Sequence, residues 1–180
     1  MNRLTEIGAD YVPALHRLGT LAALAGEDEE AVAYFQKSLE LFQGALFPNF
    51  QLAQISLRHQ ENDKALSFFS RSLSLRPGFA PAYLDLGHLY VVQNQFAEAR
   101  ETLARHLKLD PGSELGYIGL SFVALRQGEL DRAIEVLEEA VAKGVAGEES
   151  YVHLGDLHVQ KGNLARALHL SQQALRINPQ

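Results

Sequence analysis

The stretch YLDLGHLYVVQNQFAEA, residues 83–99, decides the fold of this chain. Its bulky residues Tyr83, Leu86 and Tyr90 recur at the spacing of one face of a helix. Gly87 interrupts them, although a glycine inside a helix costs about 1 kcal/mol relative to alanine. A glycine at such a position indicates that a neighbouring element needs the space.

This glycine belongs to an internal repeat of the sequence. Steps of 34 residues from Ala99 reach only alanine, at Ala31, Ala65, Ala133 and Ala167. Steps of the same length from Leu86 reach only leucine. The register holds without insertion or deletion over five blocks, which are residues 12–45, 46–79, 80–113, 114–147 and 148–180. The glycine position is always small and holds, in block order, Gly19, Ala53, Gly87, Ser121 and Gly155.

Each block predicts two amphipathic helices that pack as an antiparallel pair. We expect Gly87 to allow close approach to Ala99, while Tyr83, Leu86 and Leu103 fill the surrounding space. We also expect residues 1–11 to form a short leading helix or the remnant of a preceding repeat. The ten repeat helices are predicted near 13–25, 29–42, 47–59, 63–75, 81–93, 96–109, 115–127, 130–143, 149–161 and 164–177.

The boundaries between the helices carry residues that end helices. Between the two helices of a block, the break holds a residue that accepts a left-handed backbone. Gln60 is the exception at this position. Proline follows the second helix of three blocks, because it cannot continue a helix. The residues at the break are Gly26, Asn94, Gly128 and Gly162, and the prolines are Pro77, Pro111 and Pro179.

Composition excludes several classes of function. The net charge of −6 leaves no basic surface for a nucleic-acid backbone. The chain has no cysteine, which excludes disulfides and thiolate metal sites. No stretch approaches the roughly 18 apolar residues of a membrane span, and the first residues lack the apolar segment of a secretory signal. We therefore expect no membrane span and favour a cytoplasmic location.

The repeat resembles a known family. The tetratricopeptide repeat signature is W-x2-L-G-x2-Y, then A-x3-F, then P, on a 34-residue period. The third block reads YLDLGHLY, AEARETL and DP at these positions, and the resemblance covers residues 12–180. Tyrosine replaces tryptophan in the last three blocks, Leu15 and Asn49 stand there in the first two, and Val145 replaces one proline. The resemblance implies an all-α, right-handed superhelical solenoid of stacked antiparallel helix pairs.

The resemblance also implies a function as a protein–protein interaction scaffold. A partner's peptide or helix would lie in a concave groove lined by the first helix of each block. We expect Phe50, Leu84, Ile118 and Phe122 to form an exposed apolar stripe, which polar neighbours would help to align with the ligand. Leu24 and Val92 hold similar positions but could instead pack against neighbouring repeats. The expected groove residues are His16, Thr20, Phe47, Phe50, Gln54, Arg58, Leu84, His88, Ile118, Phe122, Arg126, Val152 and Asp156.

Two ligand classes known for this family do not fit. The clamp of lysine, arginine and asparagine that holds a terminal carboxylate has no counterpart here. Arrays associated with glycosyltransferases line their groove with an asparagine ladder. The corresponding positions here are Arg17, Gln51, Asp85, Gly119 and His153.

The histidines do not indicate an enzyme. His153 and His158 are five residues apart, which places them on different helix faces and excludes the i, i+4 metal pair. His158 takes the position of Tyr90, which indicates packing, and His88 points toward the groove. His106 stands where other blocks have serine or alanine, so we expect a tight fit. We expect no catalytic residue, no metal and no cofactor.

Self-assembly is the alternative function. A terminal repeat exposes the apolar face that an internal repeat covers, so the array could oligomerise through its open ends or its groove. Ser171 opposes this reading at the last helix, because it replaces the phenylalanine or leucine of the other blocks. With Gln172 and Gln173 beside it, that helix is the candidate for a polar cap.

Overall fold

The computed structural model describes residues 3–178, with side chains from residue 11 onward. These residues form helices and no strand. None of the helices in this part of the chain is both long enough and apolar enough to cross a membrane. The helices are α1 (Arg3–Ala25), α2 (Asp28–Leu41), α3 (Leu46–Arg58), α4 (Asn62–Leu75), α5 (Ala80–Val92), α6 (Phe96–Leu109), α7 (Glu114–Arg126), α8 (Leu130–Ala142), α9 (Glu148–Gln160) and α10 (Leu164–Ile177).

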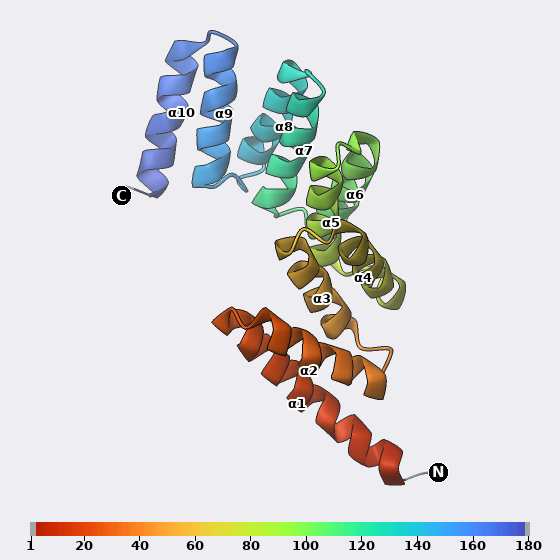
Figure 1. Ribbon diagram of the computed structural model, residues 1–180. Coiled ribbons are helices and arrows are strands. Elements are labelled where there is room, and N and C mark those ends of the chain that lie inside the picture. Colours follow the sequence, from red (N-terminus) through yellow and green to blue (C-terminus); the bar gives the residue numbers. More distant parts are fainter. Residues whose placement is uncertain (1–2, 179–180) are drawn as a thin grey trace. The chain divides into compact units, whose positions relative to one another are not determined.

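The chain divides into two compact units, Met1–Ala82 and Tyr83–Gln180. In the first unit α1 pairs with α2 and α3 pairs with α4, while α2 also packs against α3 (Figure 1). Phe35 of α2 is fully buried in one apolar cluster with Leu52 and Ile55 of α3. This cluster therefore joins the second helix of one pair to the first helix of the next.

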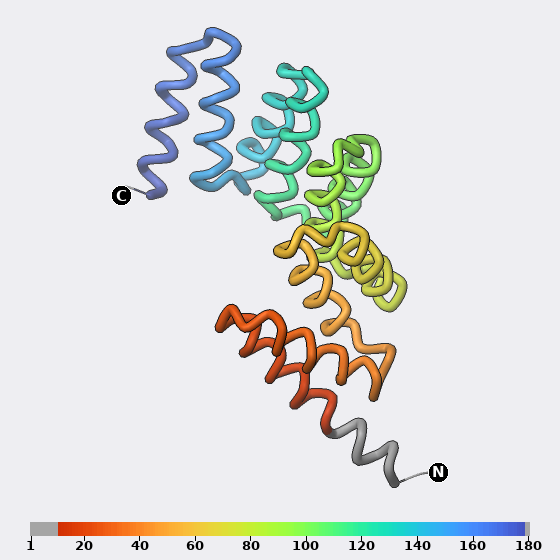
Figure 2. Tube along the Cα trace, in the orientation of Figure 1, coloured from red at the N-terminus to blue at the C-terminus, as the bar shows by residue number. Residues whose placement is uncertain are grey.

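The second unit repeats this arrangement. α7 pairs with α8 and α9 with α10, and the second helix of one pair packs against the first helix of the next at α6–α7 and α8–α9. Leu137 of α8 lies in one cluster with Leu154 and Leu157 of α9, and all three are fully buried. In the chain trace, α7 and α8 run antiparallel, and so do α9 and α10 (Figure 2).

The repeat period predicted the helix boundaries closely, with one exception. Nine helices begin and end within one residue of the expected positions. The exception is α1, which begins at Arg3 and continues through Pro13, so the expected separate leading helix is wrong. A proline inside a helix removes one backbone donor but does not always end the helix.

The turns between paired helices use the left-handed conformation at every expected position. Gly26, Gly128 and Gly162 have φ values of 81°, 79° and 82°. Asn94 and Gln60 adopt φ values of 58° and 59°. Gln60 was expected to be an exception, but the position, and not the residue type, determines the conformation.

Gly87 makes room for a side chain of the neighbouring helix. A Cβ atom on Gly87 would lie 2.6 Å from Cγ of Leu103 on α6, which is closer than atoms can approach. Leu103 and Ala99 are both fully buried in one cluster. Leu103 therefore occupies the space that a side chain at position 87 would need, and does not only fill the surrounding space.

His106 fits because its neighbour is a glycine. His106 on α6 is buried, and a Cβ atom on Gly116 of α7 would lie 2.8 Å from its Cδ2 atom. The positions equivalent to His106 hold only serine or alanine, and those equivalent to Gly116 in other repeats hold larger residues such as Pro48 and Ser150. The largest side chain found at this second-helix position thus faces the smallest found at the facing position of the next first helix.

Candidate interaction surfaces

In the first unit, the expected groove position centres on an aromatic cluster. The Phe47 ring stacks on His16 of α1, with ring centroids 5.5 Å apart, and meets Phe79 edge-on at 5.9 Å. Phe50 also meets Phe79 edge-on, at 5.0 Å. Phe47 is exposed, whereas Phe50 retains only 9% of its surface. Phe47 is therefore the accessible ring, and the buried Phe50 packs against Phe79, which in turn contacts Phe47.

The expectation that Phe50 and Ile118 would be solvent-facing members of an apolar stripe is wrong. Ile118 is only 5% exposed and lies in the core cluster of the second unit. Leu84 is half-buried against the cluster of Ala99 and Leu103. These side chains face the space between neighbouring helices, which fills with apolar residues first.

In the second unit Phe122 is the exposed aromatic residue, with 44% of its surface accessible. Its ring stacks on His153 of α9 with centroids 4.5 Å apart and planes inclined by 16°. His153 also lies 3.4 Å from the Ser121 hydroxyl, measured from Nε2 to Oγ. Burial lowers the pKa of His153, although Asp156 and Glu149 oppose the shift. The imidazole is thus held neutral against the Phe122 ring near pH 7.

Two arginines expected to contact a ligand instead join neighbouring repeats. The guanidinium of Arg58 donates to Asp28 at the start of α2, and its Nε–Oδ2 distance is 3.2 Å. This hydrogen bond is the main cause that holds the pKa of Asp28 below its ordinary value. Arg126 donates to Oδ1 of Asn94 at 2.6 Å and lies over the Phe96 ring. Both arginine side chains are exposed to solvent, but each already has a hydrogen-bond partner within the chain.

Of the remaining expected residues, four are polar and one, Val152, is apolar. The Thr20 hydroxyl donates to the carbonyl of His16 at 2.9 Å, which satisfies it within α1. His88 and Asp156 are exposed, and so is Val152. Gln54 is half-buried. The accessible apolar members of the expected set are therefore Phe47, Phe122 and Val152.

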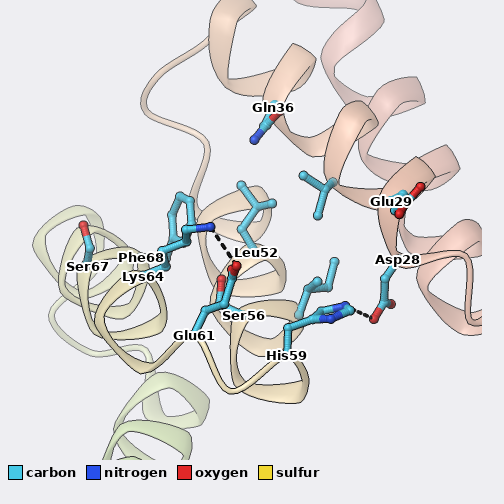
Figure 3. Close-up of a pocket in the computed structure, with 12 residues that line it drawn as sticks. Asp28, Glu29, Gln36, Leu52, Ser56, His59, Glu61, Lys64, Ser67 and Phe68 are labelled. Atoms are coloured by element: carbon cyan, nitrogen blue, oxygen red, sulfur yellow. Dashed lines mark hydrogen bonds and ion pairs between the residues drawn. The ribbon is translucent and has the colours of Figure 1, made fainter.

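A pocket that we had not predicted lies in the first unit, where α2, α3 and α4 meet (Figure 3). Its volume is about 690 Å³. Leu52, Ile55 and Ser56 are its buried residues. At its edge, Nε2 of His59 lies 2.9 Å from Oδ2 of Asp28, and Lys64 forms an ion pair with Glu61 at 2.8 Å. The full lining is Asp28, Glu29, Val32, Gln36, Leu52, Ile55, Ser56, His59, Glu61, Lys64, Ser67 and Phe68.

Small side chains distinguish this pocket from related places in the second unit. Ser56 holds the position of Tyr90 and His158, and Val32 holds that of Arg100. Arg100 reaches across to donate to Gln127 and Glu129. A comparison of each position with its equivalents in the other repeats would have found this signal, since Ser56 and Val32 are short where some other repeats are bulky.

Sequence reasoning also missed the contributions of Phe79 and His153. Phe79 precedes α5 at a position that holds Ala45, Ser113 and Gly147 elsewhere. An aromatic residue among such small ones was the available signal. His153 was compared with an asparagine ladder and with a metal pair, and neither comparison indicates its stacking on Phe122.

The paired helices, the small residue at their crossing and the left-handed turn between them define an all-α repeat protein of the solenoid class. Models of the tetratricopeptide repeat match residues 12–43, 56–118 and 119–180. The chain belongs to the tetratricopeptide repeat family. No curated protein matches the sequence.

Solved structures share the fold at low sequence identity. PilF of Pseudomonas aeruginosa is 19% identical, with a TM-score of 0.81 over 93% of this chain and 78% of that chain. MamA of Desulfovibrio magneticus RS-1 is also 19% identical, with a TM-score of 0.80 over 94% and 96%. YrrB, a tetratricopeptide repeat protein with an unusual peptide-binding site, is 20% identical, with a TM-score of 0.69 over 92% and 85%.

Proposed function

We propose that the chain is a protein-interaction scaffold that holds a peptide or helix of its partner against the first helices of its repeats. Phe122 carries this proposal, because it is a large aromatic side chain that the fold leaves exposed and holds rigidly by stacking on His153. Rigid exposed aromatic residues are frequent hot spots of protein interfaces. The five-repeat division of the sequence stays part of the proposal.

Phe47 supports the same function in the first unit. His16 and Phe79 contact the Phe47 ring on two sides and restrict its rotation. A partner that covers the ring therefore pays little side-chain entropy. The proposal includes His16, Phe47 and Phe79 in the first unit and His88, Phe122, Val152 and Asp156 in the second.

The nearby polar groups favour a polypeptide ligand. His88 is exposed on α5 and Asp156 on α9, which also carries the exposed Val152, so the first helices offer hydrogen-bonding groups as well as apolar residues. Apolar anchors flanked by polar groups suit a peptide, whose side chains and backbone require both. The proposal assigns no catalytic step, metal or cofactor to this surface.

The test begins with a peptide selected from a random library on the intact chain. Its affinity is then measured for wild type, Phe122→Ala, Phe47→Ala and Leu109→Ala, with folding checked by circular dichroism. We expect at least one aromatic substitution to weaken binding by about 2 kcal/mol, or about thirtyfold. Leu109 at the end of α6 is the control, since it is as exposed as Phe122 but belongs to a second helix. Peptides that bind both aromatic variants like wild type overturn the proposal.

A further inference from the structure

The first and last helices, α1 and α10, expose apolar side chains at positions that are buried in other repeats. Ile55 of α3 is 4% exposed because it packs in the cluster with Phe35 of α2. Leu21 holds the equivalent position on α1 and is 64% exposed. Leu18, equivalent to the buried Leu52, is also exposed. The described residues of α1 therefore present the face that a preceding second helix covers elsewhere.

Helix α10 presents the complementary face. Ile134 of α8 is buried in the cluster that α9 completes. Leu168 holds the equivalent position on α10 and is 63% exposed, and Leu175 nearby is exposed as well. Ser171 lies between them and donates to the carbonyl of Ala167 at 3.1 Å. The expected polar cap thus has exposed leucines on both sides of Ser171.

At these two faces, uncharged residues stand in place of two polar pairs that join neighbouring repeats inside the chain. Within the chain, Arg58 on α3 pairs with Asp28 on α2. The position of Arg58 is held on α1 by Leu24, and the position of Asp28 is held on α10 by Leu164. Leu24 is 80% exposed, and Leu164 is also exposed. Both members of an ion pair are thus replaced together by leucine.

A second pair of positions shows the same joint replacement. Lys161, the residue directly after α9, donates to Asp131 on α8 at 2.5 Å. The positions of Lys161 and Asp131 are held at the outer faces by Ala25 and Ala165. A single uncharged residue would leave a charge unpaired across the contact, which is unfavourable. Here neither member of the two pairs keeps a charge.

We propose that this chain associates head-to-tail with a second copy of itself, with α1 of one copy packed against α10 of the other. The register is the one that already joins α2 to α3 and α8 to α9, and it places Leu24 of one copy against Leu164 of the other. The contact is heterologous, so each copy keeps one free face and association can continue. This surface is separate from the peptide surface of Phe47 and Phe122.

The test is sedimentation velocity of the intact chain over a wide concentration range. Wild type is expected to form species larger than a dimer as concentration rises. Leu21→Glu and Leu168→Glu each place a charge on one face, and each is expected to weaken self-association at least about tenfold. An equimolar mixture of the two variants should form a one-to-one dimer and nothing larger, because each variant retains the face that the other has lost.

The mixture distinguishes this contact from a symmetric one. If α1 packed on α1, or α10 on α10, one of the two variants would still dimerise alone, and that result overturns the proposal. A wild-type chain that stays monomeric at every concentration overturns it as well. Phe122→Ala should leave association unchanged, and Leu21→Glu should leave peptide affinity unchanged, so the two proposals fail separately.

A charge exchange tests the register. Leu24→Arg alone and Leu164→Asp alone should each weaken association. The double variant should recover it, because it recreates the pairing of Arg58 with Asp28, and its association should weaken with added salt. The control is the double variant of Leu24→Arg and Leu164→Arg, which should not recover. Equal behaviour of the two double variants would contradict this register.

Discussion

Gly155→Ala should stabilise the chain, whereas Gly87→Ala should destabilise it, although the two glycines hold equivalent positions. A Cβ atom on Gly155 would find its nearest neighbours, the Ala167 carbonyl and the Ser171 hydroxyl, at 3.7 Å. That distance is ordinary van der Waals contact. A Cβ atom on Gly87 would lie 2.6 Å from Leu103, which is fully buried and has little freedom to move.

The magnitudes follow from two terms. Alanine gains about 1 kcal/mol over glycine inside a helix, and at position 155 nothing opposes this gain. At position 87 overpacking costs about 1–3 kcal/mol, which exceeds the gain in most of that range. We therefore expect the free energy of unfolding to rise by about 1 kcal/mol for Gly155→Ala and to fall by about 1 kcal/mol for Gly87→Ala.

Ser171 supplies the decisive variant, because it holds the position of Leu103. In the Ser171→Leu background a leucine would occupy the space beside Gly155, and Gly155→Ala should then become destabilising. The four chains form a double-mutant cycle with an expected coupling of about 1–3 kcal/mol. Urea unfolding followed by circular dichroism measures each corner. An unchanged sign of the alanine effect in the two backgrounds would refute the argument from space.

Four further substitutions test other parts of the fold. Ala99→Leu should destabilise by about 1–3 kcal/mol, seen as a lower Tm, because Ala99 is fully buried beside Leu103. Gln60→Gly should raise the free energy of unfolding by about 0.5–1 kcal/mol, seen as a higher urea midpoint, since Gln60 has a φ of 59°. Asn94→Gly should gain less, because asparagine tolerates that conformation. Burial lowers the pKa of His158 in the folded chain. As pH falls through about 6.5, the unfolded chain therefore takes up a proton before the folded chain does, and the free energy of unfolding should drop. In His158→Tyr, the free energy of unfolding should depend less on pH between about 7 and 5.

Those aspects of the fold that repeat in the sequence could be predicted, and those that depend on one pair of residues could not. The repeat period placed the helix ends within one residue because every repeat supplied the same signal. The start of α1 was not predicted because residues 1–11 lie outside the five blocks, where no repeated signal marks a helix end. The left-handed backbone at Gln60 was not predicted, because residue preference was given more weight than the position in the repeat.

The candidate site was predicted less well for a geometric reason. A first helix turns one side toward its partner helix, a second toward the neighbouring repeats and a third toward solvent. Helical periodicity alone separated Phe122, which is exposed, from Ile118, which is buried, too weakly to decide between them. The pocket beside Ser56 depends on the absence of a bulky side chain, and a search for functional residue types passes over such a position.

The fit between His106 and Gly116 determines which pieces of this chain can be exchanged with those of a related array. A transfer cut at the edges of a sequence repeat would move α5 and α6 together and separate His106 from the glycine that accommodates it. The imidazole would then meet a larger residue, as at Pro48 or Ser150. The transferable segment therefore runs from α5 to α7, because α6 also needs Gly87 on α5, and it ends half a repeat beyond the period that the sequence displays.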